Sequence, residues 1–397
     1  MTRADVPTAG RGSSARRMKI CIVSPNYPLY FRRDETAKFA GAEVQAAFLA
    51  GALSAAGHDV AFVVANLRDG EKLPFPAINA YRSADGAPGL RFFHPRLTGV
   101  CRALERSDAD VYYQRNASML TGVTGFFCRR KGRVLVYGAG SDTDFSFRNA
   151  RMDNFRDRVL FYAGLKIAHG VVVQNEFQKT AYLKKHDGPV RVIPNGIELA
   201  DCESQGPREL IVWIGGIRRI KQPELFLELA RRIPERRFVL VGGGSGVEPS
   251  FERQIREEAA GIPNLEMTGH VPHDGVRDYL ARALLLVNTS RVEGFPNAYL
   301  EAWNLCVPVV SFNDIDGIVE KENLGAICKG IDDMTVAVRS LAGDAGRRAE
   351  TGERARRVVD ARFSAAVLAR SYVEFFEELV YRNPRARRRA LRAQPAK

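Results

Sequence analysis

The chain contains two separate series in which short apolar runs alternate with segments of helical composition. The first series passes from an apolar run at 19–25 through a helical segment at 42–56 to a second apolar run at 61–64. The second series begins with apolar runs at 210–216 and 238–241. Short continuous apolar runs are typical of strands buried in parallel sheets, and parallel neighbours need a helical crossover. The sequence therefore predicts an α/β fold with two doubly wound domains.

The 397 residues are enough for two domains that each have their own core. Residues 1–17 are polar and basic with no apolar centre, so they are not a secretory signal, and Met18 is our preferred start of translation. We predict a disordered basic leader at 1–17, an N-terminal domain at 18–197, a linker at 198–208, a C-terminal domain at 209–365, a helix at 366–381 and a basic tail at 382–397.

The stretch from Thr289 to Ala302 carries the strongest functional signal. It follows an apolar run at 284–287, and Gly294 and Pro296 then force a turn. Since Pro suits the first turn of a helix, we expect a helix from about Asn297. Such a helix start presents unpaired N–H groups and a partial positive charge, which suit a phosphate.

Two carboxylates flank this predicted anion site. Glu293 lies just before the helix start, and Glu301 lies about one turn inside it. Carboxylates do not bind phosphate, but they accept hydrogen bonds from hydroxyl groups on either side of a diphosphate. A nucleotide-sugar has that layout. The alternative is that Glu293 caps the helix and Glu301 is a solvated side chain.

The segment Glu293-Gly294-Phe295-Pro296 with Glu301 resembles the E-x7-E signature of retaining family 4, group 1 glycosyltransferases of the GT-B fold. The resemblance extends from about residue 18 to 380 and is strongest from Val212 to Leu324. It implies two Rossmann-like domains that face each other across a cleft, the N-terminal one for the acceptor and the C-terminal one for the nucleotide-sugar. It also implies a last helix that crosses back to the N-terminal domain, and no obligatory metal or other cofactor.

The same resemblance assigns roles in the donor site. Glu293 is expected at the donor-sugar hydroxyls, Glu301 at the ribose and Lys221 at the diphosphate. Family members place an Arg where this chain has Gly216, so Arg218 or Arg219 is expected to take its place. The predicted donor-binding residues are Gly41, Gly215, Gly216, Arg219, Gly243, Gly294, Phe295, Pro296, Asn297, Ala298 and Glu301.

The acceptor half departs from the family. Many members carry a histidine near the end of the strand at 133–137, and this chain has none there. Asp142 or Asp144 is expected to take part of that role. The predicted catalytic residues are Glu293, Lys221, Arg218 and Asp142. The Asp-x-Asp spacing also occurs in metal-dependent glycosyltransferases, but we predict no metal. The aromatic and basic residues at 27–33 suit a sugar acceptor, a lipid surface or an ordinary loop.

The net charge of +13 is concentrated at the ends of the chain. Residues 1–17 hold four Arg and one Asp, a charge of +3, and residues 382–397 hold six Arg and one Lys, a charge of +7. Basic ends of this kind bind nucleic acid or anionic membrane, or merely solubilise the chain. We expect membrane contact and no nucleic-acid binding, since the tails have no interleaved aromatic residues.

The six cysteines form no C-x-x-C pair, which predicts a reducing cytoplasm and no structural zinc. We therefore predict a cytoplasmic retaining glycosyltransferase at the inner face of the membrane. It would move a sugar from a nucleotide-diphosphate sugar to a glycan or lipid-linked acceptor in surface polysaccharide synthesis. The alternative is a non-catalytic protein of GT-B fold that binds a nucleotide-sugar or a partner.

Overall fold

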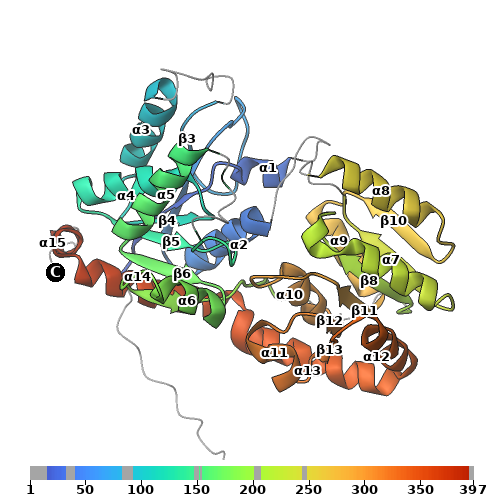
Figure 1. The fold of residues 1–397 in the computed structure, drawn as a ribbon. Coiled ribbons are helices and arrows are strands. Elements are labelled where there is room, and N and C mark those ends of the chain that lie inside the picture. Colours follow the sequence, from blue (N-terminus) through green and yellow to red (C-terminus); the bar gives the residue numbers. More distant parts are fainter. Residues whose placement is uncertain are drawn as a thin grey trace, which may run out of the picture.

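The computed structural model describes residues 16–32, 41–82, 93–146, 152, 154–200, 207–243 and 248–392. The described chain forms two α/β domains, and the last helices run from the second domain back across the first (Figure 1). Among the described residues, no helix is both long enough and apolar enough to cross a membrane. Most of the predicted leader, the middle of the predicted linker and the end of the predicted tail lie outside the described residues.

The N-terminal domain is built on a seven-stranded sheet in the order β3-β2-β1-β4-β5-β6-β7, in which every pair is parallel. Its strands are β1 (Lys19–Val23), β2 (Asp59–Val64), β3 (Ala77–Asn79), β4 (Val111–Arg115), β5 (Val134–Gly138), β6 (Gly170–Val173) and β7 (Val190–Val192). Its helices are α1 (Tyr27–Phe31), α2 (Gly41–Ala55), α3 (Thr98–Ser107), α4 (Met119–Lys131), α5 (Phe155–Ile167) and α6 (Glu176–Leu183).

The C-terminal domain is built on a six-stranded parallel sheet in the order β10-β9-β8-β11-β12-β13. Its strands are β8 (Leu210–Ile214), β9 (Arg237–Val241), β10 (Leu265–Gly269), β11 (Ala283–Asn288), β12 (Val309–Ser311) and β13 (Gly325–Ile327). Its helices are α7 (Pro223–Arg232), α8 (Pro249–Ala260), α9 (His273–Ala281), α10 (Asn297–Asn304), α11 (Ile318–Lys321), α12 (Ile331–Gly343) and α13 (Ala345–Phe363), with the short 3₁₀ helix η4 (Arg219–Lys221) after β8. The two parallel sheets confirm the predicted doubly wound α/β architecture.

The chain crosses between the domains at two places that lie side by side. Ile197 pairs with Ser364 in an isolated parallel bridge, and the Ile197 N–H donates to the Phe363 carbonyl at 3.0 Å. Helix α14 (Ala365–Arg382) then packs on the N-terminal sheet. Its buried Leu368, Tyr372 and Phe376 belong to the same apolar core as α2 and β1.

The basic segment at 382–397 is not an extended tail where the structure describes it. Helix α15 (Pro384–Arg392) packs on the N-terminal domain through the buried Ala386 and Ala390. Arg389 pairs with Asp108 at 2.8 Å and with Asp110 at 3.6 Å. The charge of this segment is therefore partly neutralised, which a count of charges along the sequence does not reveal.

Two further expectations differ from the structure. The aromatic and basic segment after β1 is the helix α1 instead of a loop, and Tyr27 is buried with its ring stacked on Phe62 at a centroid distance of 3.6 Å. Cys21, Cys101, Cys128 and Cys328 are free, whereas Cys306 is disulfide-bonded, which was not expected for a chain in a reducing compartment.

Candidate functional site

The loop between β11 and α10 is fixed to the end of β8 by buried hydrogen bonds. The buried Thr289 hydroxyl donates to the Lys221 carbonyl at 2.8 Å and accepts from the Trp213 indole N–H at 3.0 Å. The Arg291 N–H donates to the Ile220 carbonyl at 2.9 Å. These contacts place the Lys221 side chain beside the loop that carries Glu293. Both lie at the carboxyl ends of parallel strands, where open α/β sheets bind their ligands.

Lys221 and Glu293 form an ion pair in this loop. The Lys221 ammonium donates to the Glu293 carboxylate, and the Ser290 hydroxyl donates to the same carboxylate oxygen at 2.6 Å. The side chains are 25% and 10% exposed, so the pair is open to solvent mainly on the lysine side. An ammonium has three N–H donors, and among the described residues only Glu293 accepts from this one. Lys221 can therefore bind an anion and keep its contact with Glu293.

Helix α10 begins next to this ion pair. Its N-cap is Pro296, which gives no side-chain hydrogen bond to the first turn. The amides of the first turn consequently lack a side-chain cap and carry the positive end of the helix dipole. Phe295 is buried, and its ring centroid lies 5.1 Å from that of Phe363, while Ala298 packs partly buried against the same core. These two predicted donor-binding residues thus fix the helix start through packing.

A cluster of amide side chains in the N-terminal domain holds this loop from across the cleft. Asn195 is 5% exposed, and its Nδ2 group donates to the Phe295 carbonyl at 2.7 Å and to Asn297 Oδ1 at 2.8 Å. Asn175 Nδ2 donates to the Gly294 carbonyl at 2.9 Å. We call Gln45, Gln174, Asn175, Gln178 and Asn195 the amide cluster.

Further bonds complete the amide cluster. Asn195 Oδ1 accepts from Arg115 Nη2 at 2.7 Å and from Gln174 Nε2 at 3.0 Å. Gln45 Nε2 donates to the Gly196 carbonyl at 2.9 Å and to Asn297 Oδ1 at 3.1 Å. None of the five residues of the amide cluster was predicted as a site residue. The available signal was only local, since Asn195-Gly196 is a turn sequence and Asn175 is a helix cap.

Two of the predicted glycines lie where the domains approach each other closely. A Cβ atom on Gly294 would lie 2.2 Å from Gln174 Oε1, and one on Gly41 would lie 2.7 Å from Asn297 Nδ2. Asn297 Nδ2 also donates to the Gly41 carbonyl at 3.3 Å. The start of α2 therefore meets the start of α10, and the approach of this loop to the donor phosphates stays a prediction.

Asp142 and Asp144 have different surroundings. Asp144 is buried and accepts from the Tyr137 hydroxyl at 2.7 Å and from the Gly140 and Ser141 N–H groups at 2.8 and 3.2 Å, so it stabilises its own loop. Asp142 is half-buried and accepts from Gln178 Nε2 at 2.8 Å. Burial raises its pKa, and the negative charges of Glu293 and Asp316 raise it further. Of the two, Asp142 is the one whose charge interacts with the site.

The two candidate phosphate arginines also differ. Arg219 is exposed and turns away, with its guanidinium 4.5 Å from the centroid of the Phe251 ring on α8. The backbone N–H of Arg219 donates to Glu248 Oε2 at 2.7 Å. Arg218 is half-buried and directly precedes η4, the helix that ends in Lys221. The contacts of Arg219 thus lie on the α8 side, and Arg218 as the second cation of the site stays a prediction.

The glycines after β8 and β9 allow two loops to approach each other. Gly242 has a φ of +146°, and a Cβ there would lie 1.9 Å from the Gly215 carbonyl. The Gly243 carbonyl accepts from the Ile217 N–H at 3.0 Å, and a Cβ on Gly243 would lie 3.0 Å from the His270 N atom. At Gly216 the nearest atom would be 3.9 Å away. Gly215 and Gly243 are thus tightly packed, whereas a side chain at Gly216 would make only ordinary contacts.

Glu301 lies on the wall of a cavity between the two domains. The cavity has a volume of about 750 Å³, and Gln45, Phe48, Asn297 and Glu301 are among the residues that line it. Ligand pockets commonly measure about 300–1,000 Å³. Within the described part of the chain, no group of three or more His, Cys, Asp or Glu side chains is arranged to hold a metal ion.

Comparisons with known proteins match both halves of the chain. A family model described as glycosyl transferases group 1 matches residues 208–344, and one described as glycosyltransferase family 4 matches residues 39–201. One similar protein is glycosyltransferase 1 domain-containing protein 1 of Xenopus tropicalis, 30% identical over 129 residues, which are 31% of this chain and 36% of that protein. Another is a subunit of phosphatidylinositol N-acetylglucosaminyltransferase from Arabidopsis thaliana, 30% identical over 157 residues, which are 37% of this chain and 35% of that protein. The chain thus spans about a third of the length of each of these two curated relatives.

Solved structures resemble nearly the whole chain. Sucrose-phosphate synthase from Thermosynechococcus elongatus superposes with a TM-score of 0.72 at 21% identity, over 92% of this chain and 100% of that one. Anabaena HepE in complex with UDP and glucose superposes with a TM-score of 0.70 at 16% identity, over 91% of this chain and 100% of that one. At such identities the likeness shows the fold alone, and it confirms the GT-B architecture expected from the sequence.

Proposed function

Since the chain belongs to the group 1, family 4 glycosyltransferases, we propose that it transfers a sugar from a nucleotide-diphosphate sugar to a glycan or lipid-linked acceptor with retention of anomeric configuration. The observation that carries this proposal is the Lys221–Glu293 ion pair beside the start of α10, which carries no side-chain cap. This arrangement offers cationic and N–H donors to a diphosphate next to a carboxylate that accepts from hydroxyl groups.

The chemical task is to stabilise the negative charge that grows on the departing diphosphate. Lys221, Arg218 and the first-turn amides of α10 would supply this stabilisation electrostatically. Glu293 would accept from hydroxyl groups of the donor sugar, and its contacts with Lys221 and Ser290 keep it oriented. Glu301 would accept from the ribose one turn further along the same helix.

The acceptor would enter from the side of the N-terminal domain. Asp142 would face the donor sugar and hold its hydroxyl groups, in the place of the histidine that the chain lacks. Among the described residues of the site no side chain is a matched general base, so the leaving phosphate oxygen would take the proton of the acceptor hydroxyl. In that route the acceptor oxygen bonds to the anomeric carbon on the face from which the diphosphate leaves, so the anomeric configuration is retained.

We further propose that the reaction serves surface polysaccharide synthesis in the cytoplasm, at the inner face of the membrane. The support for membrane contact is the basic C-terminal segment, of which α15 exposes Arg385 and Arg388. The support for a glycan or lipid-linked acceptor is the cavity of about 750 Å³ between the domains, whose N-terminal-domain wall includes Tyr30, Phe31 and Phe75, while Glu301 belongs to its C-terminal-domain wall.

The test is a panel of UDP-, GDP- and ADP-sugars, screened by thermal stabilisation of the purified chain. The nucleotide-sugar that stabilises it is then used to measure slow hydrolysis of the donor and to determine the anomer of the product by NMR. Lys221→Met is expected to lower turnover by about 10²- to 10³-fold, which is the usual effect of removing one hydrogen-bond donor that stabilises transition-state charge in an enzyme. The matched control is Lys329→Met, at an exposed position after β13. No stabilisation by any nucleotide, or unchanged turnover in Lys221→Met, would contradict the proposal.

A further inference from the structure

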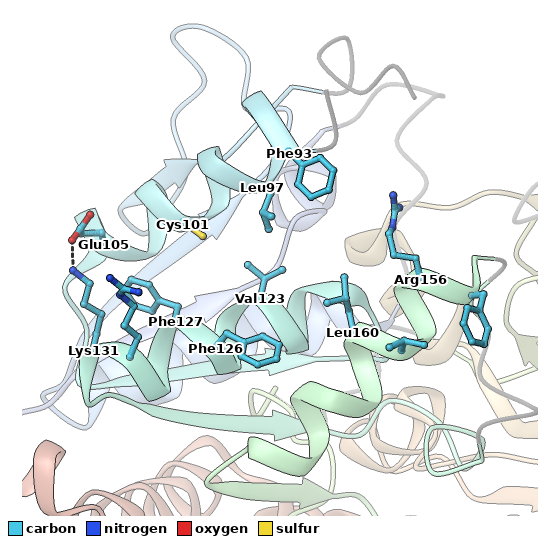
Figure 2. Close-up of a pocket in the computed structure, with 13 residues that line it drawn as sticks. Phe93, Leu97, Cys101, Glu105, Val123, Phe126, Phe127, Lys131, Arg156 and Leu160 are labelled. Carbon is cyan, nitrogen blue, oxygen red and sulfur yellow. Dashed lines mark hydrogen bonds and ion pairs between the residues drawn. The ribbon is translucent and has the colours of Figure 1, made fainter. Parts of the chain in front are cut away.

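A second cavity lies on the surface of the N-terminal domain, between α3, α4 and α5. It has a volume of about 760 Å³. Figure 2 shows Phe93 and Leu97 on one side of it, facing Val123 and Phe126 of α4 on the other. We call this cavity the apolar groove. The contacts of the proposed donor site do not involve it.

The apolar groove exposes large hydrophobic side chains that a soluble domain normally buries. Phe155 is 70% exposed, Phe93 60%, Phe126 51% and Val159 44%. Single exposed apolar residues are ordinary, but four around one groove form a contiguous patch, and such patches commonly mark interaction sites.

The floor of the apolar groove is rigid. Helices α4 and α5 approach so closely that a Cβ on Gly164 would lie 2.4 Å from the Gly122 N atom, and one on Gly122 would lie 2.3 Å from the Leu160 carbonyl. Backbone thus packs on backbone below the groove. The groove is therefore a permanent part of the fold instead of a gap that neighbouring side chains fill.

Cations border one end of the apolar groove. Arg129 and Arg130 lie in the last turn of α4 and are exposed, and neither has an ion-pair partner among the described residues. Lys131 follows them and pairs with Glu105 at 2.6 Å.

Helix α15 adds its arginines at this same end. Gly132 ends α4, and a Cβ on it would lie 2.8 Å from the Cβ of Arg385. Asp108, which caps the end of α3, pairs with Arg389. Figure 1 shows α4 and α15 on the edge of the N-terminal domain that faces away from the C-terminal domain. Arg385 and Arg388 are exposed there.

We propose that this face docks on the surface of an anionic lipid bilayer. The exposed phenylalanines insert among the acyl chains, and the arginines bind the lipid phosphates. An apolar centre with a cationic border is the pattern that interfacial membrane binding requires, and guanidinium groups bind phosphate with two parallel hydrogen bonds. Arg130 lines the groove, and the exposed Arg129 and Arg385 lie beside the same end of α4, which a groove for a neutral protein segment would not need.

The placement also connects the bilayer to the proposed active site. Phe155 begins α5, so it follows the loop that carries Asp142 after β5. The groove therefore extends along α4 from the cleft side of the domain to its outer edge. A lipid-linked acceptor in the bilayer would have its head group near the acceptor side of the cleft. The inference goes beyond the proposed transfer reaction, and vesicle binding is measured without donor, so either can fail alone.

The test is co-sedimentation of the full chain with vesicles of phosphatidylcholine alone or mixed with phosphatidylglycerol. We expect binding to the mixed vesicles that weakens as salt is added. The variant Phe126→Ser/Phe155→Ser is expected to lower the partition coefficient at least about tenfold. The variant Arg129→Glu/Arg130→Glu is expected to lower it by about fivefold per arginine or more. All of these positions are exposed, so folding and donor hydrolysis should be unchanged.

Matched controls stand away from the groove. Phe177→Ser replaces a phenylalanine on α6 that is 65% exposed, and Arg253→Glu/Arg357→Glu replaces two exposed arginines of the C-terminal domain. Binding that these controls reduce as much as the groove variants would overturn the proposal, and so would an absence of vesicle binding. Sedimentation velocity without lipid gives the remaining outcome. A dimer that Phe126→Ser/Phe155→Ser dissociates would assign the groove to a second copy of the chain and overturn the lipid proposal.

Discussion

Replacing Asn195 tests whether the amide cluster couples the two domains. Asn195 belongs to the N-terminal domain, but its Nδ2 group makes two bonds to the C-terminal domain, at 2.7 Å to the Phe295 carbonyl and 2.8 Å to Asn297 Oδ1. Its Oδ1 atom accepts two more, from Arg115 and Gln174. With a net value of about 1 kcal/mol per buried bond, Asn195→Ala should lower the free energy of unfolding by about 3–4 kcal/mol.

A double-mutant cycle isolates the bond between the domains. Asn297→Ala loses the bonds from Asn195 and Gln45 and its own bond to the Gly41 carbonyl, and should cost about 2–3 kcal/mol. The Asn195–Asn297 bond is removed by either change, so the double variant should be less destabilised than the sum by about 1 kcal/mol. The control cycle pairs Asn195 with Asn264, whose amide bonds lie within the C-terminal domain, and should be additive within about 0.5 kcal/mol.

Two spectroscopic probes distinguish the domains during urea unfolding. The chain has two tryptophans, Trp213 on β8 and Trp303 on α10, so fluorescence reports only the C-terminal domain. Far-UV circular dichroism reports both domains. We expect coincident transitions for the native chain and separated ones for Asn195→Ala. A cycle that is additive within about 0.3 kcal/mol, with coincident transitions in every variant, would refute the coupling.

Three further predictions follow from the contacts. Asp142 has a raised pKa, so its protonated form stabilises the fold in acid, and this contribution is lost as the pH rises through the raised pKa. Asp142→Asn should therefore increase Tm at neutral pH, with a gain that disappears in acid, as thermal unfolding at several pH values would show. Turnover should fall in the same variant. Arg32 pairs with Glu71 at 2.7 Å, and both side chains are largely buried, so Arg32→Met should lower the free energy of unfolding by about 3 kcal/mol at neutral pH. Since the pKa of Glu71 is lowered, the difference in stability between the native chain and the variant should shrink as the pH falls through that pKa, which urea titrations at several pH values measure. Gly164→Ala should lower the free energy of unfolding by about 2 kcal/mol, because the new Cβ would meet the backbone of Gly122. Gly346→Ala on α13 makes only ordinary contacts and should raise the free energy of unfolding by up to about 1 kcal/mol. Thermal unfolding of both variants measures the two effects.

The sequence predicted the parts of this molecule that depend on local pattern. Continuous apolar runs gave strands of both parallel sheets, because strands buried on both faces need no alternation. The turn at Gly294 and Pro296 gave the start of α10 within one residue, since both residue types restrict the backbone in known ways. Lys221 and Glu293 were expected in one site and form an ion pair, although their roles stay predictions.

Residues whose partners lie far along the chain were missed for a physical reason. Asn195 and its partner Asn297 are separated by 102 residues, and Gln45 and Asn297 by 252. Asn in a turn and at a helix cap already satisfies a local role, so nothing in its neighbours indicates a second contact across a cleft. A cluster of Asn and Gln near the ends of several predicted strands is the signal that an analysis of both domains together could have used.

Charge is the property for which a local interpretation fails most clearly. The segment at 382–397 has a net charge of +7, and an isolated stretch of that charge would stay extended through self-repulsion. Asp108 and Asp110 offset part of it by binding Arg389, and Ala386 and Ala390 supply apolar contacts at a helical spacing of four. The segment stays basic as a helix, and its remaining charge has a fixed position. Arg385 and Arg388 are exposed, and Arg385 lies beside Gly132 at the end of α4. A charge that is fixed on a rigid surface beside apolar groups can bind a bilayer in one orientation, whereas the same charge on a flexible end could not orient the cleft toward an acceptor.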